Sequence, residues 1–175
     1  YFSAYKSLNK LNKLNNRSPL KIEKQHYFID ILEECLQISI AIIPILKGKT
    51  IALWGLAFKP DTDDIREAPA LYMIEHLLEA GASIVAYDPE AMPNVQKQKG
   101  YAISYATDAY EALEGADALL ICTEWGMFRN PDFDKIGKAL KSKVIFDGRN
   151  LYELDKMQEL GYFYKSIGRS TVNND

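Results

Sequence analysis

The protein is 175 residues long, with 47% apolar and 26% charged residues and a formal net charge of −3. These proportions are typical of a soluble globular protein that has one domain with attached segments. Two cysteines are too few for a disulfide framework, the mild negative charge is unlike that of a nucleic-acid-binding protein, and the longest apolar run, residues 38–46, is too short to cross a bilayer. We therefore expect a cytoplasmic protein with no metal cluster and no nucleic-acid or membrane partner.

The first part of the chain differs in charge from the rest. Residues 1–24 hold six Lys or Arg against one Glu, and a repeat of Leu, Asn and Lys or Asn over residues 8–16 has a period that suits neither a helix nor a strand. We interpret residues 1–18 as a poorly ordered or fragmentary arm. It lacks interleaved aromatic residues, which favours a solvated tail over a nucleic-acid contact.

A long helix is predicted over residues 19–47. Apolar residues recur there at spacings of three and four, Pro19 suits the first helical position, Pro44 is expected to bend the last turn, and Gly48 marks the end. At 1.5 Å per residue the helix would reach on the order of 40 Å, more than a small domain needs. We expect it to connect two domains or to form a homodimer.

From Lys49 onward, strand-like and helix-like segments alternate. We predict strands over residues 50–58, 82–88, 101–106, 116–123, 143–147 and 162–167, and helices over 67–80, 107–115 and 131–141. Continuous apolar strands separated by helices are typical of a mostly parallel sheet covered on both faces. Residues 48–175 are therefore predicted to form a doubly wound, Rossmann-like α/β domain, preceded by the long connecting helix. Ligands of such sheets bind at the carboxyl ends of the strands.

The loop that leaves the first predicted strand is rich in charge. Residues 55–70, GLAFKPDTDDIREAPA, place one Lys, one Arg and four acids before a helix. A dinucleotide-binding turn would have the pattern G-x-G-x-x-G, which Gly55 does not begin. Asp88 ends the second predicted strand, where such folds keep a ribose-binding acid. Because Pro89 follows and no glycine fingerprint precedes it, we favour an Asp-Pro turn.

Five segments of the chain, taken in order, resemble the C-terminal, UDP-binding domain of the UDP-glucose/GDP-mannose dehydrogenase family. They are GLAFKPDTDDIREAPA (55–70), YDPEAM (87–92), ADALLICTEW (116–125), VIFDGRN (144–150) and YFYKSIGR (162–169). The resemblance covers about residues 44–169 and is strongest to the members that act on UDP-glucose. The predicted long helix corresponds to the interdomain helix of the family.

The resemblance implies part of an enzyme that oxidises C6 of UDP-glucose twice, with two NAD⁺ and a cysteine-bound thioester, to give UDP-glucuronate. Family members place the NAD-binding domain and the catalytic cysteine before the long helix. Neither Cys35 nor Cys122 lies in the sequence context of that cysteine. We therefore expect a C-terminal part without catalytic residues, inactive by itself, whose NAD is bound mainly by a preceding domain. GDP-mannose or an N-acetylated UDP-sugar stays open as the substrate of the parent enzyme.

The same resemblance assigns Phe58, Lys59 and Arg149 to the binding of UDP-glucose or UDP, and Arg66 to the NAD of the other domain. An ammonium and a planar guanidinium both suit phosphate oxygens. The structural alternatives are that Lys59 and Arg66 pair with nearby carboxylates and that Phe58 is a core aromatic. Cys122 is expected to be a buried apolar residue.

Further residues have simple structural interpretations. We expect Trp125 to pack in the core and His26 and His76 to lie at the surface or at an interface. Two other functions stay open. One is a dimerising module without a ligand, suggested by the long helix, and the other is an independent NAD-binding protein, suggested by the fold pattern and Asp88.

Overall fold

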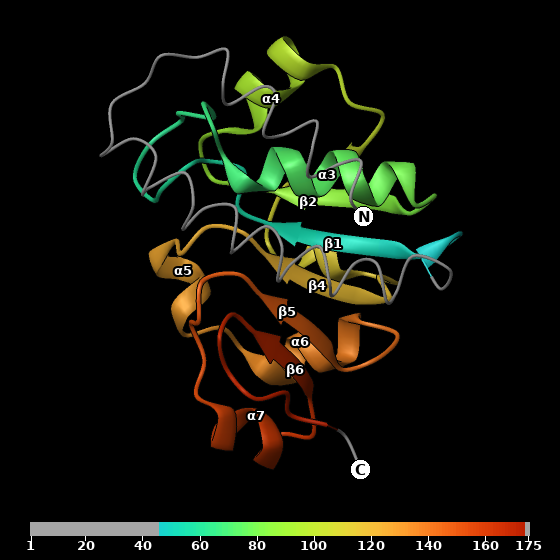
Figure 1. The fold of residues 1–175 in the computed structure, drawn as a ribbon, viewed down its shortest axis with the longest axis vertical. Helices are drawn as coiled ribbons and strands as arrows, with labels where there is room; N and C mark the ends of the chain where they lie inside the picture. Colours follow the sequence, from blue (N-terminus) through green and yellow to red (C-terminus); the bar gives the residue numbers. More distant parts are fainter. Residues whose placement is uncertain (1–45, 174–175) are drawn as a thin grey trace, which may run out of the picture. The chain divides into compact units, whose positions relative to one another are not determined.

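The computed structural model describes residues 46–173, which form a six-stranded sheet in which all neighbouring strands are parallel (Figure 1). The strands are β1 (Thr50–Trp54), β2 (Ser83–Tyr87), β3 (Ser104–Tyr105), β4 (Ala118–Ile121), β5 (Val144–Asp147) and β6 (Phe163–Ser166). The helices are α3 (Pro69–Glu79), α4 (Met92–Lys99), the 3₁₀ helix η1 (Glu111–Leu113), α5 (Gly126–Arg129), α6 (Phe133–Ala139) and α7 (Leu154–Glu159). The predicted α/β fold class is confirmed. The predicted arm over 1–18, and the predicted helix as far as residue 45, lie outside the described residues.

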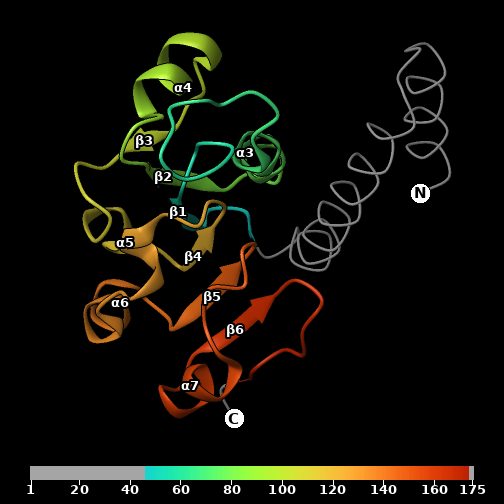
Figure 2. The same cartoon turned by 90° about the vertical axis from the view of Figure 1, so that its left-hand side faces the viewer.

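The strand order in the sheet is β3-β2-β1-β4-β5-β6. The chain builds outward from β1 to β3, returns to the centre and builds outward again from β4 to β6. β1 and β4 are therefore the neighbouring strands at which the winding reverses, and the crevice beside their carboxyl ends is the usual ligand position in such sheets. Figure 2 shows α3 on one side of the sheet and α5 and α6 on the other.

The central strands form the core. Every side chain of β4 is buried, as is every side chain of β1 after Thr50, whereas β2, β5 and β6 alternate between buried and more exposed positions. A central parallel strand is covered on both faces by helices, so it has no side on which polar residues are needed. This is why β1 and β4 appear in the sequence as unbroken apolar runs.

Two predicted elements are shorter than expected because of the backbone conformation at one of their ends. The strand predicted over 50–58 ends at Trp54, since Gly55 has a φ of 92° that breaks the extended conformation. The helix predicted over 67–80 begins at Pro69, since Glu67 has a left-handed φ of 57°.

The segment between β2 and β4 also differs from the prediction. The strand predicted over 101–106 is reduced to β3, and the helix predicted over 107–115 is reduced to η1. The Asp108 carboxylate accepts hydrogen bonds from the backbone N–H groups of Tyr110 and Glu111, so this segment begins as an Asx-type turn. Gly115, with a φ of 66°, then turns the chain into β4.

Three short helices, α4, α5 and α7, were not predicted. Each buries a single side chain: Val95 in α4, Phe128 in α5 and Met157 in α7. One buried residue in a helix of four to eight residues gives no apolar repeat, so the periodicity used for prediction is absent.

Candidate functional site

The loops after β1 and β4 approach each other closely at Gly55. Gly55 donates its N–H to the Tyr87 carbonyl at 2.9 Å, and a β-carbon added to Gly55 would lie 2.5 Å from Cβ of Thr123. The Thr123 hydroxyl donates to the Ala57 carbonyl at 2.6 Å. Only glycine therefore fits at residue 55, and the loops after β1 and β4 are held against each other.

Asp88 is the main organiser of this edge. Its carboxylate is fully buried; one oxygen accepts from Leu56 N (2.7 Å), Ala57 N (3.0 Å) and Trp125 Nε1 (3.0 Å). The other oxygen accepts from Glu90 N (2.9 Å) and Ala91 N (2.7 Å), which confirms the Asp-Pro turn. With five donors and no exposure, this carboxylate has no place for a ribose hydroxyl.

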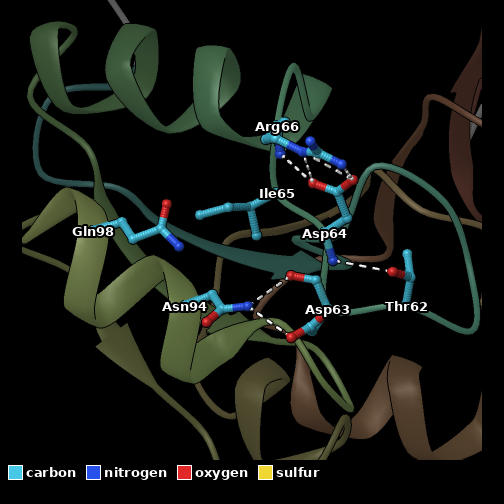
Figure 3. A pocket seen from close by; sticks show the side chains of 7 residues that line it. All are labelled: Thr62, Asp63, Asp64, Ile65, Arg66, Asn94 and Gln98. Atoms are coloured by element: carbon cyan, nitrogen blue, oxygen red, sulfur yellow. Dashed lines mark hydrogen bonds and ion pairs between the residues drawn. The ribbon is translucent and has the colours of Figure 1, made fainter.

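The loop from Phe58 to Arg66 is held by its own hydrogen bonds. Phe58 donates its backbone N–H to the Asp64 carbonyl at 2.8 Å, and Asp64 donates its own to the Thr62 hydroxyl at 3.2 Å. Asn94 of α4 donates to both the carbonyl and the carboxylate of Asp63 at 2.9 Å (Figure 3). The loop is thereby attached to α4 on one side of the crevice.

Arg66 is paired with a carboxylate of its own loop. Its guanidinium donates to both oxygens of Asp64, with Nη2 at 2.6 Å, and its side chain is 86% exposed (Figure 3). The hydrogen bond from this guanidinium lowers the pKa of Asp64 to about 2. The carboxylate-paired alternative for Arg66 is therefore the arrangement in the structure. Together with Asn94, Gln98 and the rest of residues 62–66, the pair lines an open hollow of about 410 Å³.

Phe58 and Lys59 project from the same loop. The Phe58 side chain is 45% exposed, so the alternative of a core aromatic is wrong. Lys59 is exposed, and no carboxylate of residues 46–173 lies within ion-pair distance of it. Neither residue lines the hollow beside Arg66. An aromatic ring and an unpaired ammonium are therefore accessible next to the carboxyl end of β1.

The loop after β5 is built on a second buried carboxylate. Asp147 accepts hydrogen bonds from the backbone N–H groups of Arg149 and Leu151 and from the Tyr164 hydroxyl, each at 2.7 Å. Burial and the Asp147 carboxylate raise the pKa of Tyr164 well above its usual value. Gly148 donates its N–H to the Ile121 carbonyl of β4 at 2.9 Å. The Asp-Gly-Arg corner is therefore fixed to the end of β4.

The side chain of Arg149 forms an ion pair with Glu124 through Nε and Oε2. Burial, the largest single effect, acts to raise the pKa of Glu124, but the contact with Arg149, the Glu124 backbone N–H and the charges of Arg149 and Arg129 together outweigh it, so the pKa lies below its usual value. No role for Glu124 was predicted from the sequence. Glu124 could have been found from its place in the loop after β4. Because β4 and β5 are adjacent parallel strands, the loops after their carboxyl ends, which carry Glu124 and Arg149, lie side by side.

Lys59 and Arg149 are on the same edge of the sheet but are not in contact. They follow β1 and β5, which are separated by β4 alone. At the usual strand spacing the ends of β1 and β5 lie roughly 10 Å apart. The loops that carry the two cations therefore leave the same edge of the sheet, from the strands on either side of β4.

The remaining candidates have structural roles. Cys122 and Trp125 are buried, as expected, and His76 is exposed on α3, 3.7 Å from Glu79 Oε2. Within residues 46–173 there is no group of three or more His, Cys, Asp or Glu side chains placed to hold a metal ion. In the same residues, no helix has the length and apolar character required to span a membrane.

Part of this chain is similar to known proteins. Residues 52–154 match the UDP-binding domain of the UDP-glucose/GDP-mannose dehydrogenase family. The chain is 48% identical over 128 residues to UDP-glucose 6-dehydrogenase from Pseudomonas aeruginosa, and 48% identical over 127 residues to UDP-glucose 6-dehydrogenase TuaD from Bacillus subtilis. The aligned parts cover 70% and 73% of this chain, which spans only 28% of the length of each relative.

A solved structure is also similar. The NDP-N-acetyl-D-galactosaminuronic acid dehydrogenase from Methanosarcina mazei Go1 aligns with a TM-score of 0.68 and 25% identity, over 92% of this chain and 35% of that one.

Proposed function

Since the chain belongs to the UDP-glucose/GDP-mannose dehydrogenase family, through the UDP-binding domain of that family, we propose that it binds the UDP part of UDP-glucose. We propose further that it does so as part of an NAD-dependent UDP-glucose 6-dehydrogenase that produces UDP-glucuronate. The 48% identity to two enzymes of that name supports this substrate.

The observation that supports the proposal is that the loops carrying Lys59 and Arg149 follow β1 and β5, the strands on either side of β4. Lys59 provides a compact positive charge that forms no ion pair with a carboxylate of residues 46–173. Arg149 provides a planar set of donors that matches phosphate oxygens. The exposed ring of Phe58 adds an apolar surface beside them, suited to the base or ribose. Together they offer a nucleoside diphosphate two charge contacts and one flat contact.

In the complete enzyme, bound NAD would supply the acceptor for the hydride. This domain does not itself fit a dinucleotide, because its first loop lacks the glycine pattern and Asp88 is fully occupied by protein donors. Its contribution to NAD in the proposal is Arg66, which lies on the exposed surface of the loop after β1. In the present structure Arg66 is held by Asp64, so contact with NAD requires it to exchange that partner.

Titration calorimetry and thermal unfolding with UDP test the binding role. We expect UDP to raise the melting temperature of the 175-residue chain, because a ligand bound by the folded form alone stabilises it. Lys59→Ala and Arg149→Ala should each weaken UDP binding by roughly tenfold or more, the effect of one lost charge-assisted hydrogen bond. Lys138→Ala, an exposed charge change in α6, is the matched control and should leave the affinity unchanged.

Two results would contradict the proposal. No binding of UDP at millimolar concentration by folded protein would remove the function. Unchanged affinity in both variants would remove Lys59 and Arg149 from the site.

A second candidate substrate is an N-acetylated nucleotide sugar. It is supported by the similarity to the Methanosarcina mazei enzyme, whose name specifies such a sugar. GDP-mannose is the third candidate substrate. Competition of each nucleotide sugar against UDP distinguishes the three, and stronger binding of UDP-glucose is expected.

Three further points complete the proposal. The parent enzyme is proposed to be a cytoplasmic homodimer that associates through the helix predicted over 19–47, of which residues 19–45 lie outside the described part of the chain. Sedimentation of a clean monomer at high concentration would contradict this. A dimerising module without any ligand is the competing function, which UDP binding would exclude. The 175-residue chain is expected to produce no NADH from UDP-glucose, and steady turnover by it would overturn that expectation.

A further inference from the structure

Glu124 and Arg149 form a partly buried pair beside the proposed phosphate position. The two side chains are 21% and 28% exposed, and Nε of Arg149 contacts Oε2 of Glu124. That oxygen is buried and accepts no hydrogen bond from the described residues, so its contact with Arg149 is an ion pair. An ion pair so shielded from water is stronger than the exposed pairs elsewhere on the surface.

The backbones of both residues are fixed independently of this pair. Arg149 N donates to Asp147, and the neighbouring Gly148 is bonded to the Ile121 carbonyl. On the other side, Thr123 is held against the loop after β1. The position of each Cα is therefore set by the sheet, and the ion pair determines only where the long side chain of Arg149 lies.

The contact leaves part of the guanidinium available. Glu124 meets Nε, and neither terminal amino group of Arg149 donates a hydrogen bond to any residue among 46–173. Two terminal amino groups in one plane are the donors with which arginine makes bidentate contacts to phosphate. A free arginine side chain loses much rotamer freedom when it binds a ligand. An arginine already held at Nε loses less.

We infer that Glu124 is a positioning residue, which holds Arg149 through Nε so that its terminal amino groups are ready to bind the diphosphate. The inference rests on the proposed function. Glu124 itself does not touch the ligand. The low pKa of its carboxyl, caused by Arg149 against the effect of burial, keeps the charge in place at neutral pH. The charge of Arg129 also lowers this pKa.

The opposite role for Glu124 is competition with the ligand for Arg149. In that case removal of the carboxylate would free the guanidinium and strengthen binding. The two roles therefore predict changes of opposite sign in the same measurement.

The test is a double-mutant cycle on UDP affinity in the full 175-residue chain, measured by calorimetry. Glu124→Ala should weaken UDP binding by roughly tenfold, and Glu124→Gln, which keeps the shape and one oxygen acceptor, should recover part of the loss. In an Arg149→Ala background, Glu124→Ala should cause no further loss. Glu153→Ala is the control, because it also removes the carboxylate of a Glu–Arg pair, the 3.9 Å pair with Arg169, but Glu153 is 89% exposed. This variant should bind UDP as tightly as the unaltered chain.

Each outcome decides the inference. Tighter binding by Glu124→Ala would show competition. If Glu124→Ala weakens UDP binding equally in the presence and absence of Arg149, the role of Glu124 is purely structural. Tighter binding or equal losses of affinity would each overturn the inference but leave the proposed function standing. Failure of the unaltered chain to bind UDP would remove the proposed function and this inference with it. If Glu124→Ala does not fold, as judged by its melting curve, Glu124→Gln carries the cycle alone.

Discussion

The replacement Asp88→Asn tests how the carboxyl edge of the sheet is held together. Asparagine keeps the shape of the side chain but replaces one acceptor oxygen by an NH₂ donor. One oxygen of Asp88 accepts three hydrogen bonds and the other accepts two, from Glu90 N and Ala91 N. The least costly orientation turns the NH₂ group toward the second pair. Two backbone N–H groups then lose their acceptor.

The size of the effect follows from the burial of those groups. A buried donor without an acceptor costs about 1–3 kcal/mol, so two cost about 2–6 kcal/mol. The hydrogen bond from Glu90 N is only part-buried, so water can replace the lost acceptor there. We therefore expect Asp88→Asn to lower the free energy of unfolding by about 3 kcal/mol. For a domain of this size such a loss lowers the melting temperature by roughly 10 °C.

Urea unfolding followed by the fluorescence of Trp54 and Trp125 measures this loss. Asp108→Asn is the matched control. Asp108 also accepts two backbone N–H groups, at 2.7 and 2.9 Å, but it is exposed. Water can satisfy those donors, so the control should cost less than about 1 kcal/mol. Equal losses of stability in the two variants would refute the link between the burial of Asp88 and its importance.

Three further predictions concern stability. Gly55→Ala should cost about 3 kcal/mol of unfolding free energy, measured with urea, because the new β-carbon would overlap the loop after β4 and residue 55 has a left-handed φ. The control Gly100→Ala also has a left-handed φ, 58°, but no atom lies within 4 Å of its new carbon, so it should cost about 1 kcal/mol. Similar costs in the two variants would contradict the overlap. Burial acts to raise the pKa of Asp117, but hydrogen bonds from a backbone N–H and two lysines lower it from 3.8 to about 2. Because the pKa of Asp117 is lower in the folded state, its carboxylate stabilises the fold above pH 4, and this stabilisation is lost as the pH falls toward 2. Asp117→Asn should therefore cost about 1 kcal/mol at neutral pH, after screening by solvent, and almost nothing near pH 2. A cost that does not change with pH would exclude this linkage. Tyr164→Phe removes a buried 2.7 Å hydrogen bond to Asp147 and should cost about 1–2 kcal/mol, and a neutral result would mean that Asp147 is satisfied without it.

The family membership expected from the five motifs is confirmed, and so are the strands of the sheet. Both depend on features that are local in the chain. The buried strands are short apolar runs, and the loops that follow them carry the polar residues by which the family is identified. The short helices α4, α5 and α7 have no such local signature, since each buries one side chain.

The candidate site was predicted only in part. Phe58, Lys59 and Arg149 were named from the family resemblance, and all three follow strands at one edge of the sheet. Glu124 was not assigned, because its partner Arg149 is 25 positions further along the chain. The five hydrogen bonds of Asp88 likewise include donors from three separate loops.

The alternation of apolar runs with helical segments, and the motifs between them, follow from the sequence alone, because hydrophobic burial and turn chemistry act on residues close together in the chain. Strand order, the pairing of Glu124 with Arg149 and the burial of Asp88 depend on packing between distant segments. Those segments meet only when the sheet has formed, and the low solvent access there gives these polar contacts their strength.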